Sequence, residues 1–158
     1  MRTRKEMIKL DETDVKKEKS KSFWLFLAWG VATLATAGSL YMSEIMHFIP
    51  CSLCWFQRIF MYPLSIILGI AFVKEDTGIV KYALPLAIIG GCFSVYHTII
   101  QKIPPDSTIA ACGPTSCQED YLNWFGFITI PMLALFAFLI IVIALFRLRK
   151  LNGGNQNK

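Results

Sequence analysis

Long stretches with few or no charged residues constrain this chain more than any other feature of its sequence. The first, Phe23–Met42, has twenty residues without a charge. A helix of that length, at about 1.5 Å per residue, spans the roughly 30 Å hydrocarbon core of a bilayer. Similar stretches follow at residues 55–73, 80–100 and 121–146. The sequence therefore predicts an all-α membrane protein, a bundle of four transmembrane helices.

Composition supports this class. Hydrophobic residues make up 54% of the 158 residues, which is too many for a soluble domain with a largely polar surface. The net charge of +5 would suit a nucleic-acid partner, but no patch that combines basic and aromatic residues is visible. The basic residues flank the apolar stretches instead, so membrane topology explains the charge.

The distribution of Lys and Arg orients the bundle. Eight of the sixteen lie in the first 21 residues, others lie in the turn between the second and third stretches, and three follow the fourth stretch at residues 147–150. Basic flanks stay in the cytoplasm. We therefore predict a mostly disordered cytoplasmic tail over 1–22, a membrane domain over 23–150 and a cytoplasmic tail over 151–158. The loops 43–54 and 101–120 then face outward, away from the cytoplasm.

One alternative concerns the first stretch. Ala35-Thr36-Ala37 followed by Gly38 resembles a signal-peptidase site. The apolar run continues past it to Met42 and a long polar region precedes it, which favours an uncleaved helix.

Two pairs of cysteines fall on the outer face of this topology, although no cysteine was used to derive it. Cys51 and Cys54 form a Cys-x-x-Cys pair where the second helix begins, and Cys112 and Cys117 lie in the second outer loop. A disulfide across so small a loop is constrained and readily reduced, and a helix N-terminus favours a thiolate. The pattern predicts disulfides Cys51–Cys54 and Cys112–Cys117 that exchange electrons.

Two other interpretations of the cysteines stay open. The pairs could be inert local disulfides, although closing such short loops restrains little chain entropy. Four thiolates could also hold zinc, but an oxidising face and the lack of a paired His or carboxylate argue against a metal. We predict no metal site. The fifth cysteine, Cys92, is expected to be a small buried residue within the third helix.

A membrane dithiol that is oxidised needs an electron acceptor, and the sequence has no metal, haem or flavin motif. A lipid-soluble quinone needs only an apolar slot with a few polar donors. Arg58 lies about one turn inside the second helix, where a charge requires either snorkelling or a polar partner. His97 and Gln101 lie at the same depth on the third helix and are candidates for the same site. His47 is expected to be a loop residue.

These motifs resemble a known family. Four membrane helices, the run C-x-x-C-W-F-Q-R at 51–58, the run H-T-I-I-Q at 97–101 and a second cysteine pair in the next outer loop resemble the DsbB family of thiol:quinone oxidoreductases. The short spacing of the second pair most resembles its Gram-positive branch, BdbC. The resemblance covers residues 23 to 150.

The resemblance implies a mechanism. Cys112 would form a mixed disulfide with an extracytoplasmic thioredoxin-like thiol oxidase similar to DsbA or BdbD, and Cys117 would resolve it. Electrons would pass to Cys51 and Cys54, and Cys54 would be the thiolate that faces the quinone. Menaquinone or ubiquinone would bind without a covalent link.

The same resemblance also implies which residues would surround the quinone. This chain departs from the family's pattern in two places. Arg58 would lie beside the quinone ring, with His97 and Gln101 nearby. Better-known members separate the second cysteine pair by a longer loop, and some carry an acidic residue where this chain has Gln57.

Two alternatives to a thiol:quinone oxidoreductase remain. A vitamin K epoxide reductase-like enzyme shares the combination of bundle and dithiol, but its quinone-facing Cys-x-x-Cys lies late in the chain, whereas here it comes first. The other alternative is a non-enzymatic membrane factor stapled by disulfides.

Overall fold

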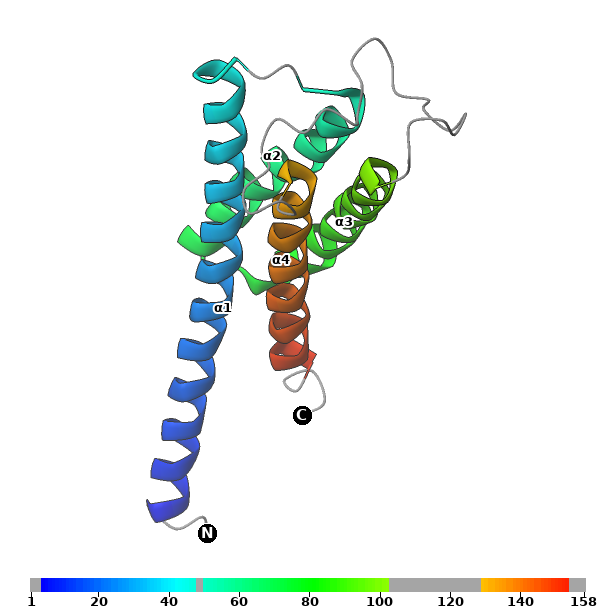
Figure 1. Cartoon of the computed structure of the whole chain (residues 1–158). Coiled ribbons are helices and arrows are strands. Elements are labelled where there is room, and N and C mark those ends of the chain that lie inside the picture. Colours follow the sequence, from blue (N-terminus) through cyan, green and yellow to red (C-terminus); the bar gives the residue numbers. More distant parts are fainter. Residues whose placement is uncertain (1–3, 48–49, 103–128, 154–158) are drawn as a thin grey trace.

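The computed structural model describes residues 4–47, 50–102 and 129–153, with side chains described from residue 12 to residue 101 and from 129 onward within those ranges. Its elements are four helices and one short 3-10 turn (Figure 1). They are α1 (Arg4–Glu44), α2 (Ser52–Val73), η1 (Thr77–Ile79), α3 (Val80–Lys102) and α4 (Ile130–Gly153). All four α-helices are long and apolar enough to cross a membrane, and the described ranges contain no strand. The predicted fold class, an all-α four-helix membrane bundle, is confirmed.

The helices alternate in direction and form a ring. α1 and α3 each contact both α2 and α4. Figure 1 shows that α1 ends, α2 begins and α3 ends toward one end of the bundle, while α2 passes into α3 through η1 at the other. We name these the Cys51 end and the Lys74 end. α1 begins and α4 finishes toward the Lys74 end, so an even number of crossings brings both helix termini to one side.

Packing differs between the two ends. The main core of buried apolar side chains lies toward the Lys74 end and draws on every helix; it includes Leu25, Leu68, Ala87, Ile141, Leu145 and Leu148. At the Cys51 end, the buried cluster among the described residues contains Cys51, Leu53 and Ile100, with Cys54 and Phe93 packed against it. The four helices are therefore more tightly joined at the Lys74 end than at the Cys51 end.

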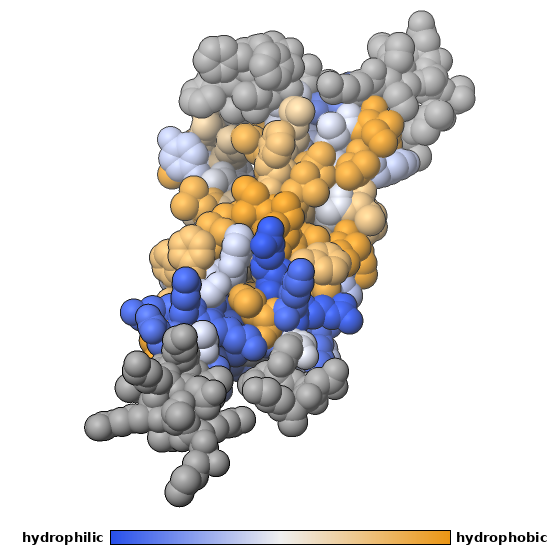
Figure 2. Space-filling model, turned by 90° about the horizontal axis from the view of Figure 1, so that it is seen from below, coloured by the Kyte–Doolittle hydropathy of each residue, from blue (hydrophilic) through white to orange (hydrophobic). Residues whose placement is uncertain are grey.

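The outer surface suits a lipid environment. Large apolar side chains are exposed on all four helices, among them Leu34, Ile66, Tyr82 and Phe136. Figure 2, viewed from the Lys74 end, shows a cluster of hydrophilic residues beside extensive hydrophobic surface. Arg147, Arg149 and Lys150 near the end of α4 are exposed. A hydrophobic flank next to a basic end is typical of membrane helices.

Three details differ from the sequence-based expectations. The first 22 residues were expected to be mostly disordered, but α1 is helical from Arg4. An i,i+3 ion pair of 2.6 Å between Lys21 and Glu18 supports the helix where α1 meets the apolar stretch. α4 was expected to end near Phe146 and continues to Gly153. Cys92 is exposed on the bundle surface rather than buried, because small neighbours do not by themselves place a residue on the inner face.

Some predictions lie outside the described residues. These are Cys112, Cys117 and their disulfide, most of the outer loop 101–120, and the first part of the predicted fourth helix, residues 121–128.

Candidate active site

The Cys-x-x-Cys pair lies at the first turn of α2. Cys51 is the N-cap residue, with extended backbone (φ −69°, ψ 168°), and the helix begins at Ser52. An N-cap followed by helix brings residues three apart onto one side, so the two sulfurs lie 3.2 Å from each other as free thiols. Cys51 is buried and Cys54 is half-buried. The two sulfurs are thus positioned to form or break a bond with little movement.

The surroundings of Cys51 favour its thiolate. The hydrogen-bonded Cys54 thiol is the largest influence and lowers the pKa of Cys51 to about 4; burial opposes this shift, and His97 adds to it. In the reduced pair, the negative charge therefore belongs on Cys51 and the shared proton on Cys54. The resemblance instead implies Cys54 as the thiolate that faces the acceptor, which concerns a different state of the pair and stays a prediction.

His97 approaches the pair from α3. Its Nε2 atom lies 3.6 Å from Cys51 Sγ, and its Nδ1 atom lies 3.2 Å from Gln57 Nε2 on α2. The ring is only 1% exposed, and Gln57 is 6% exposed. A buried imidazole with partners on both nitrogens is held in one orientation.

Aromatic stacking joins α2 to α3 beside this contact. The ring of Phe93 stacks on Phe56 at 5.2 Å and on Phe60 at 5.6 Å between centroids. Because Phe93 precedes His97 by four residues, it lies one turn away on the same face of α3. The stacking therefore fixes the height at which His97 meets Cys51.

Arg58 is held between two helices. Its Nη2 atom donates a hydrogen bond of 3.2 Å to the carbonyl oxygen of Ser39 on α1, and its guanidinium lies 5.6 Å from the ring centroid of Trp55. Both contacts offset the cost of a charge within a membrane helix. The side chain is half-buried and directed across the bundle rather than along the surface.

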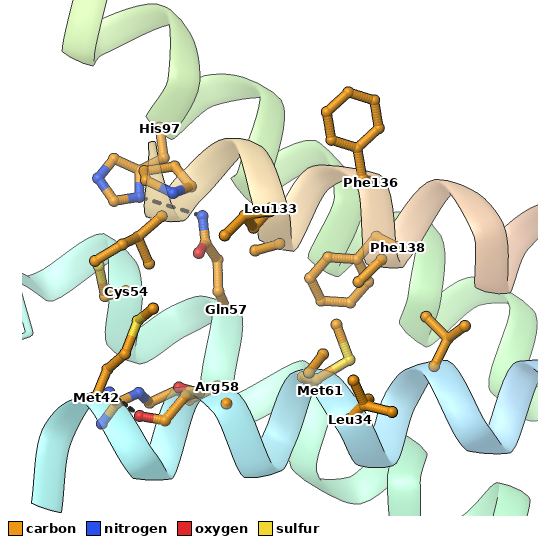
Figure 3. Close-up of a pocket in the computed structure, with 18 of the residues that line it drawn as sticks. Leu34, Met42, Cys54, Gln57, Arg58, Met61, His97, Leu133, Phe136 and Phe138 are labelled. Carbon is orange, nitrogen blue, oxygen red and sulfur yellow. Dashed lines mark hydrogen bonds between the residues drawn. The ribbon is translucent and has the colours of Figure 1, made fainter. Parts of the chain in front are cut away.

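A cavity of about 600 Å³ opens beside these residues. It lies between α1, α2 and α4, and the end of α3 closes it with His97 and Gln101. In Figure 3, Cys54, Gln57, Arg58 and His97 gather at one end, while Leu34, Met61 and Phe138 lie at the other. The cavity therefore has a polar end that contains the dithiol and an apolar remainder.

Small residues create this space. Gly30 and Gly38 on α1 line the cavity, and a Cβ added at either position would meet no atom within 4 Å. Ala134 and Ala137 line it from α4. Larger side chains at these positions would fill the gap between α1 and α4, so the open volume is a product of residue size.

The structure brings together five of the seven predicted site residues. Cys51, Cys54, Arg58, His97 and Gln101 all line the same cavity. The other two, Cys112 and Cys117, are not described. His47 lies in the connection after α1 and is exposed, as expected of a loop residue.

Gln57 is the site residue that sequence reasoning missed. It was noted only as a departure from an acidic residue. The signal was present, because Cys54, Gln57, Arg58 and Met61 follow the i, i+3, i+4, i+7 spacing of one helix face.

The same cluster also has the donor atoms of a soft metal site. The ligand atoms of Cys51, Cys54 and His97 all lie within 4.8 Å of one another. The sequence indicated no histidine beside the cysteines, since 42 residues separate Cys54 from His97 in the chain. We treat the three groups as a hydrogen-bonded dithiol site and keep the prediction of no metal.

Comparisons with known proteins identify the family of this chain. Residues 20–148 match the family model described as "Disulfide bond formation protein DsbB". The chain is 55% identical to "Probable disulfide formation protein C 1" of Bacillus anthracis over 131 residues, 82% of this chain and 94% of that protein.

Two further relatives carry similar names. "Disulfide bond formation protein C" of Bacillus subtilis (strain 168) is 54% identical over 126 residues, 79% of this chain and 91% of that protein. A "Probable disulfide formation protein" of Coxiella burnetii is 50% identical over 122 residues, 76% of this chain and 83% of that protein. No solved structure matches. The chain therefore belongs to the DsbB family of disulfide bond formation proteins, and that membership implies an oxidoreductase.

Proposed function

We propose that this protein is a thiol:quinone oxidoreductase that reoxidises an extracytoplasmic thioredoxin-like thiol oxidase and transfers the electrons to quinone. One observation carries the proposal: the Cys51/Cys54 dithiol opens into a largely apolar cavity within the membrane bundle. A dithiol that served only as a staple would need no such space beside it.

The cavity residues fit a quinone. Gly30 and Gly38 leave room for a flat ring and part of an isoprenoid chain, and the apolar lining suits both. Arg58, His97 and Gln101 would surround the polar ring oxygens, because they lie at the end that contains the dithiol. A bound quinone supplies an acceptor for two electrons and two protons.

Cys51 and Cys54 have different roles in the exchange. In the oxidised pair, an incoming thiolate attacks Cys51 Sγ, the Cys51–Cys54 bond breaks, and Cys54 leaves as a thiolate into the cavity. This explains how the resemblance can assign Cys54 to the acceptor although the reduced pair favours the charge on Cys51. When the disulfide re-forms, the pair gives up two electrons and the one proton that it holds on Cys54; the other proton left earlier, when Cys51 became a thiolate.

The incoming thiolate would come from Cys112 or Cys117. Oxidation of the partner converts two of its thiols to a disulfide and reduces Cys112–Cys117 to two thiols. Exchange with Cys51–Cys54 then restores that outer disulfide. We place both pairs on the extracytoplasmic face of a bacterial cell membrane, because the Lys- and Arg-rich flanks mark the other side.

A reconstituted assay tests the proposal. Purified protein in lipid nanodiscs would receive a reduced thioredoxin-fold thiol oxidase and either a ubiquinone or a menaquinone analogue. We expect oxidation of the partner with one quinone reduced per disulfide formed, and loss of turnover in Cys51→Ser and in Cys112→Ser. Cys92→Ser is the matched control and should keep full activity.

Other outcomes would reject the proposal. Turnover that persists in Cys51→Ser would remove the dithiol from the reaction. Cysteines that stay oxidised in cells whatever the quinone supply would favour the disulfide-stapled factor instead.

A further inference from the structure

A chain of hydrogen-bond partners runs from α2 through α3 and back to the cysteine pair. Gln57 Nε2 lies 3.2 Å from His97 Nδ1, and His97 Nε2 lies 3.6 Å from Cys51 Sγ. All three residues are buried, with Gln57 6%, His97 1% and Cys51 6% exposed. A buried imidazole has few alternative partners, so these contacts decide where its proton resides.

The chemistry of the amide determines the direction of the chain. An amide nitrogen carries two hydrogens and only donates, so with Gln57 Nε2 facing the ring His97 Nδ1 accepts from Gln57. A neutral imidazole that accepts at Nδ1 carries its proton on Nε2. That Nε2–H then points to Cys51 Sγ, where it stabilises a thiolate and cannot take a proton from a thiol.

We propose that Gln57 is a positioning residue that fixes His97 in the tautomer with the proton on Nε2, directed at Cys51. The functional meaning of this inference rests on the proposed redox role of Cys51. The tautomer itself can be measured whether or not the protein turns over. Among the described residues Gln57 forms a hydrogen bond with His97 and none with either sulfur, so it acts on Cys51 through the imidazole.

Replacing the amide by a carboxylate of the same shape reverses the pattern. In Gln57→Glu both side-chain oxygens accept when ionised, so His97 Nδ1 must carry a proton in order to keep its contact. In Gln57→Leu the contact is lost and neither tautomer is selected. The two variants therefore separate a change of proton position from a loss of packing.

Nitrogen-15 NMR can measure the tautomer directly, because the chain contains only two histidines. We would label histidine in the reduced protein in nanodiscs and assign His97 with His47→Asn, since His47 is exposed in a connection. Wild type should show an unprotonated Nδ1 and a protonated Nε2. Gln57→Glu should show a protonated Nδ1, and Gln57→Leu a mixture.

The control is Ser94→Ala, on α3 close to His97. Ser94 is fully buried, and its hydroxyl has no partner among the described residues, so its loss should leave the His97 signals unchanged. A protonated Nδ1 in neutral wild-type His97 would overturn the proposal, as would an Nδ1 state that is the same in wild type and in Gln57→Glu.

A second measurement follows the consequence at sulfur. The rate of Cys51 alkylation is measured against pH on the Cys51 peptide and reports the fraction of Cys51 present as thiolate. This thiolate also faces Cys54 and shares the cavity with Arg58. Loss of an aligned donor through Gln57→Leu should raise the midpoint by roughly 0.5 to 1 pH unit. An unchanged midpoint, together with a changed tautomer, would show that the imidazole does not act on Cys51 and would reject that part of the proposal.

Discussion

Cys51 is the residue at which charge, burial and helix geometry meet. The Cys54 thiol and His97 lower its pKa below that of a free thiol, so its thiolate persists at pH values where a free thiol is protonated. We expect iodoacetamide to alkylate Cys51 of the reduced protein at pH values below about 8, where a free thiol slows. His97→Phe should move the midpoint upward. Glutathione in the same tube is the reference, and a midpoint near that of glutathione would contradict the assignment.

Arg58 is the residue whose charge is best placed for a ligand in the cavity. It reaches the carbonyl of Ser39 and lines the polar end. A charged hydrogen bond contributes about 1.5–3 kcal/mol, so Arg58→Met should raise the KM for quinone by roughly tenfold or more. Exchange with the thioredoxin-fold partner should be unaffected. Arg58→Lys keeps the charge but not the planar donors and should fall between the two. Equal KM values in wild type and Arg58→Met would remove Arg58 from the ligand site.

The sequence allowed part of this site to be predicted. Arg58 and His97 stood out because charged or titratable residues inside membrane helices require a partner. Gln57 did not stand out, because a neutral amide on a helix surface is common and its meaning depends on His97, forty residues away. The proton position in the pair also depends on a 3.2 Å contact that spacing alone does not specify.

At the scale of the elements, Gly90 sets how closely α3 approaches α4. A Cβ added at Gly90 would overlap the ring of Phe138 and lie 3.0 Å from Phe60 Cβ, whereas one at the adjacent Gly91 would meet only Phe138 Cβ at 3.7 Å. Overpacking of this kind costs about 1–3 kcal/mol. We expect Gly90→Ala to lower the thermal midpoint in detergent and Gly91→Ala to leave it unchanged or raise it slightly. A normal midpoint in Gly90→Ala would mean that Phe138 and Phe60 can both move aside freely.

A substitution at Gly30 on α1 can test ligand binding separately from stability. Gly30→Leu places a side chain at the cavity, where an added Cβ meets no atom within 4 Å, and improves helix propensity by about 1 kcal/mol. We expect a raised KM for quinone together with an unchanged or higher thermal midpoint. Thr33→Leu, at an exposed position of α1 that does not line the cavity, is the control and should leave KM unchanged. A Gly30→Leu protein with normal quinone kinetics would place the ligand elsewhere.

The helices were predicted with uneven accuracy, for physical reasons. Hydropathy located α2 and α3 within about three residues, because polar turns bound them on both sides. α1 extends far beyond its apolar stretch, since an ion-paired polar helix such as the one around Lys21 and Glu18 carries no hydrophobic signal. α4 continues past Phe146 because basic residues are compatible with a helix C-terminus and do not end it.

At the scale of the whole molecule, charge distribution predicts the orientation. Glu44 is the last residue of α1, at the Cys51 end, and Glu75 lies in the turn at the Lys74 end; both are exposed. We expect a membrane-impermeant maleimide to label Glu44→Cys in intact cells and Glu75→Cys only after lysis. Labelling is counted as the excess over that of the protein without the added cysteine. The reverse pattern would invert the topology and place the dithiol in the cytoplasm.

The uneven packing of the bundle has a consequence for its lifetime in the cell. Side chains fill the Lys74 end, whereas the described residues leave a cavity of about 600 Å³ toward the Cys51 end. An occupant that binds only the folded bundle adds RT ln(1 + [L]/Kd) to its stability, about 2.7 kcal/mol at a hundredfold excess over Kd. Cells starved of that occupant should therefore hold less of the protein, because the empty bundle is degraded sooner. The abundance of the protein would then reflect how much of this lipid-soluble occupant the membrane contains.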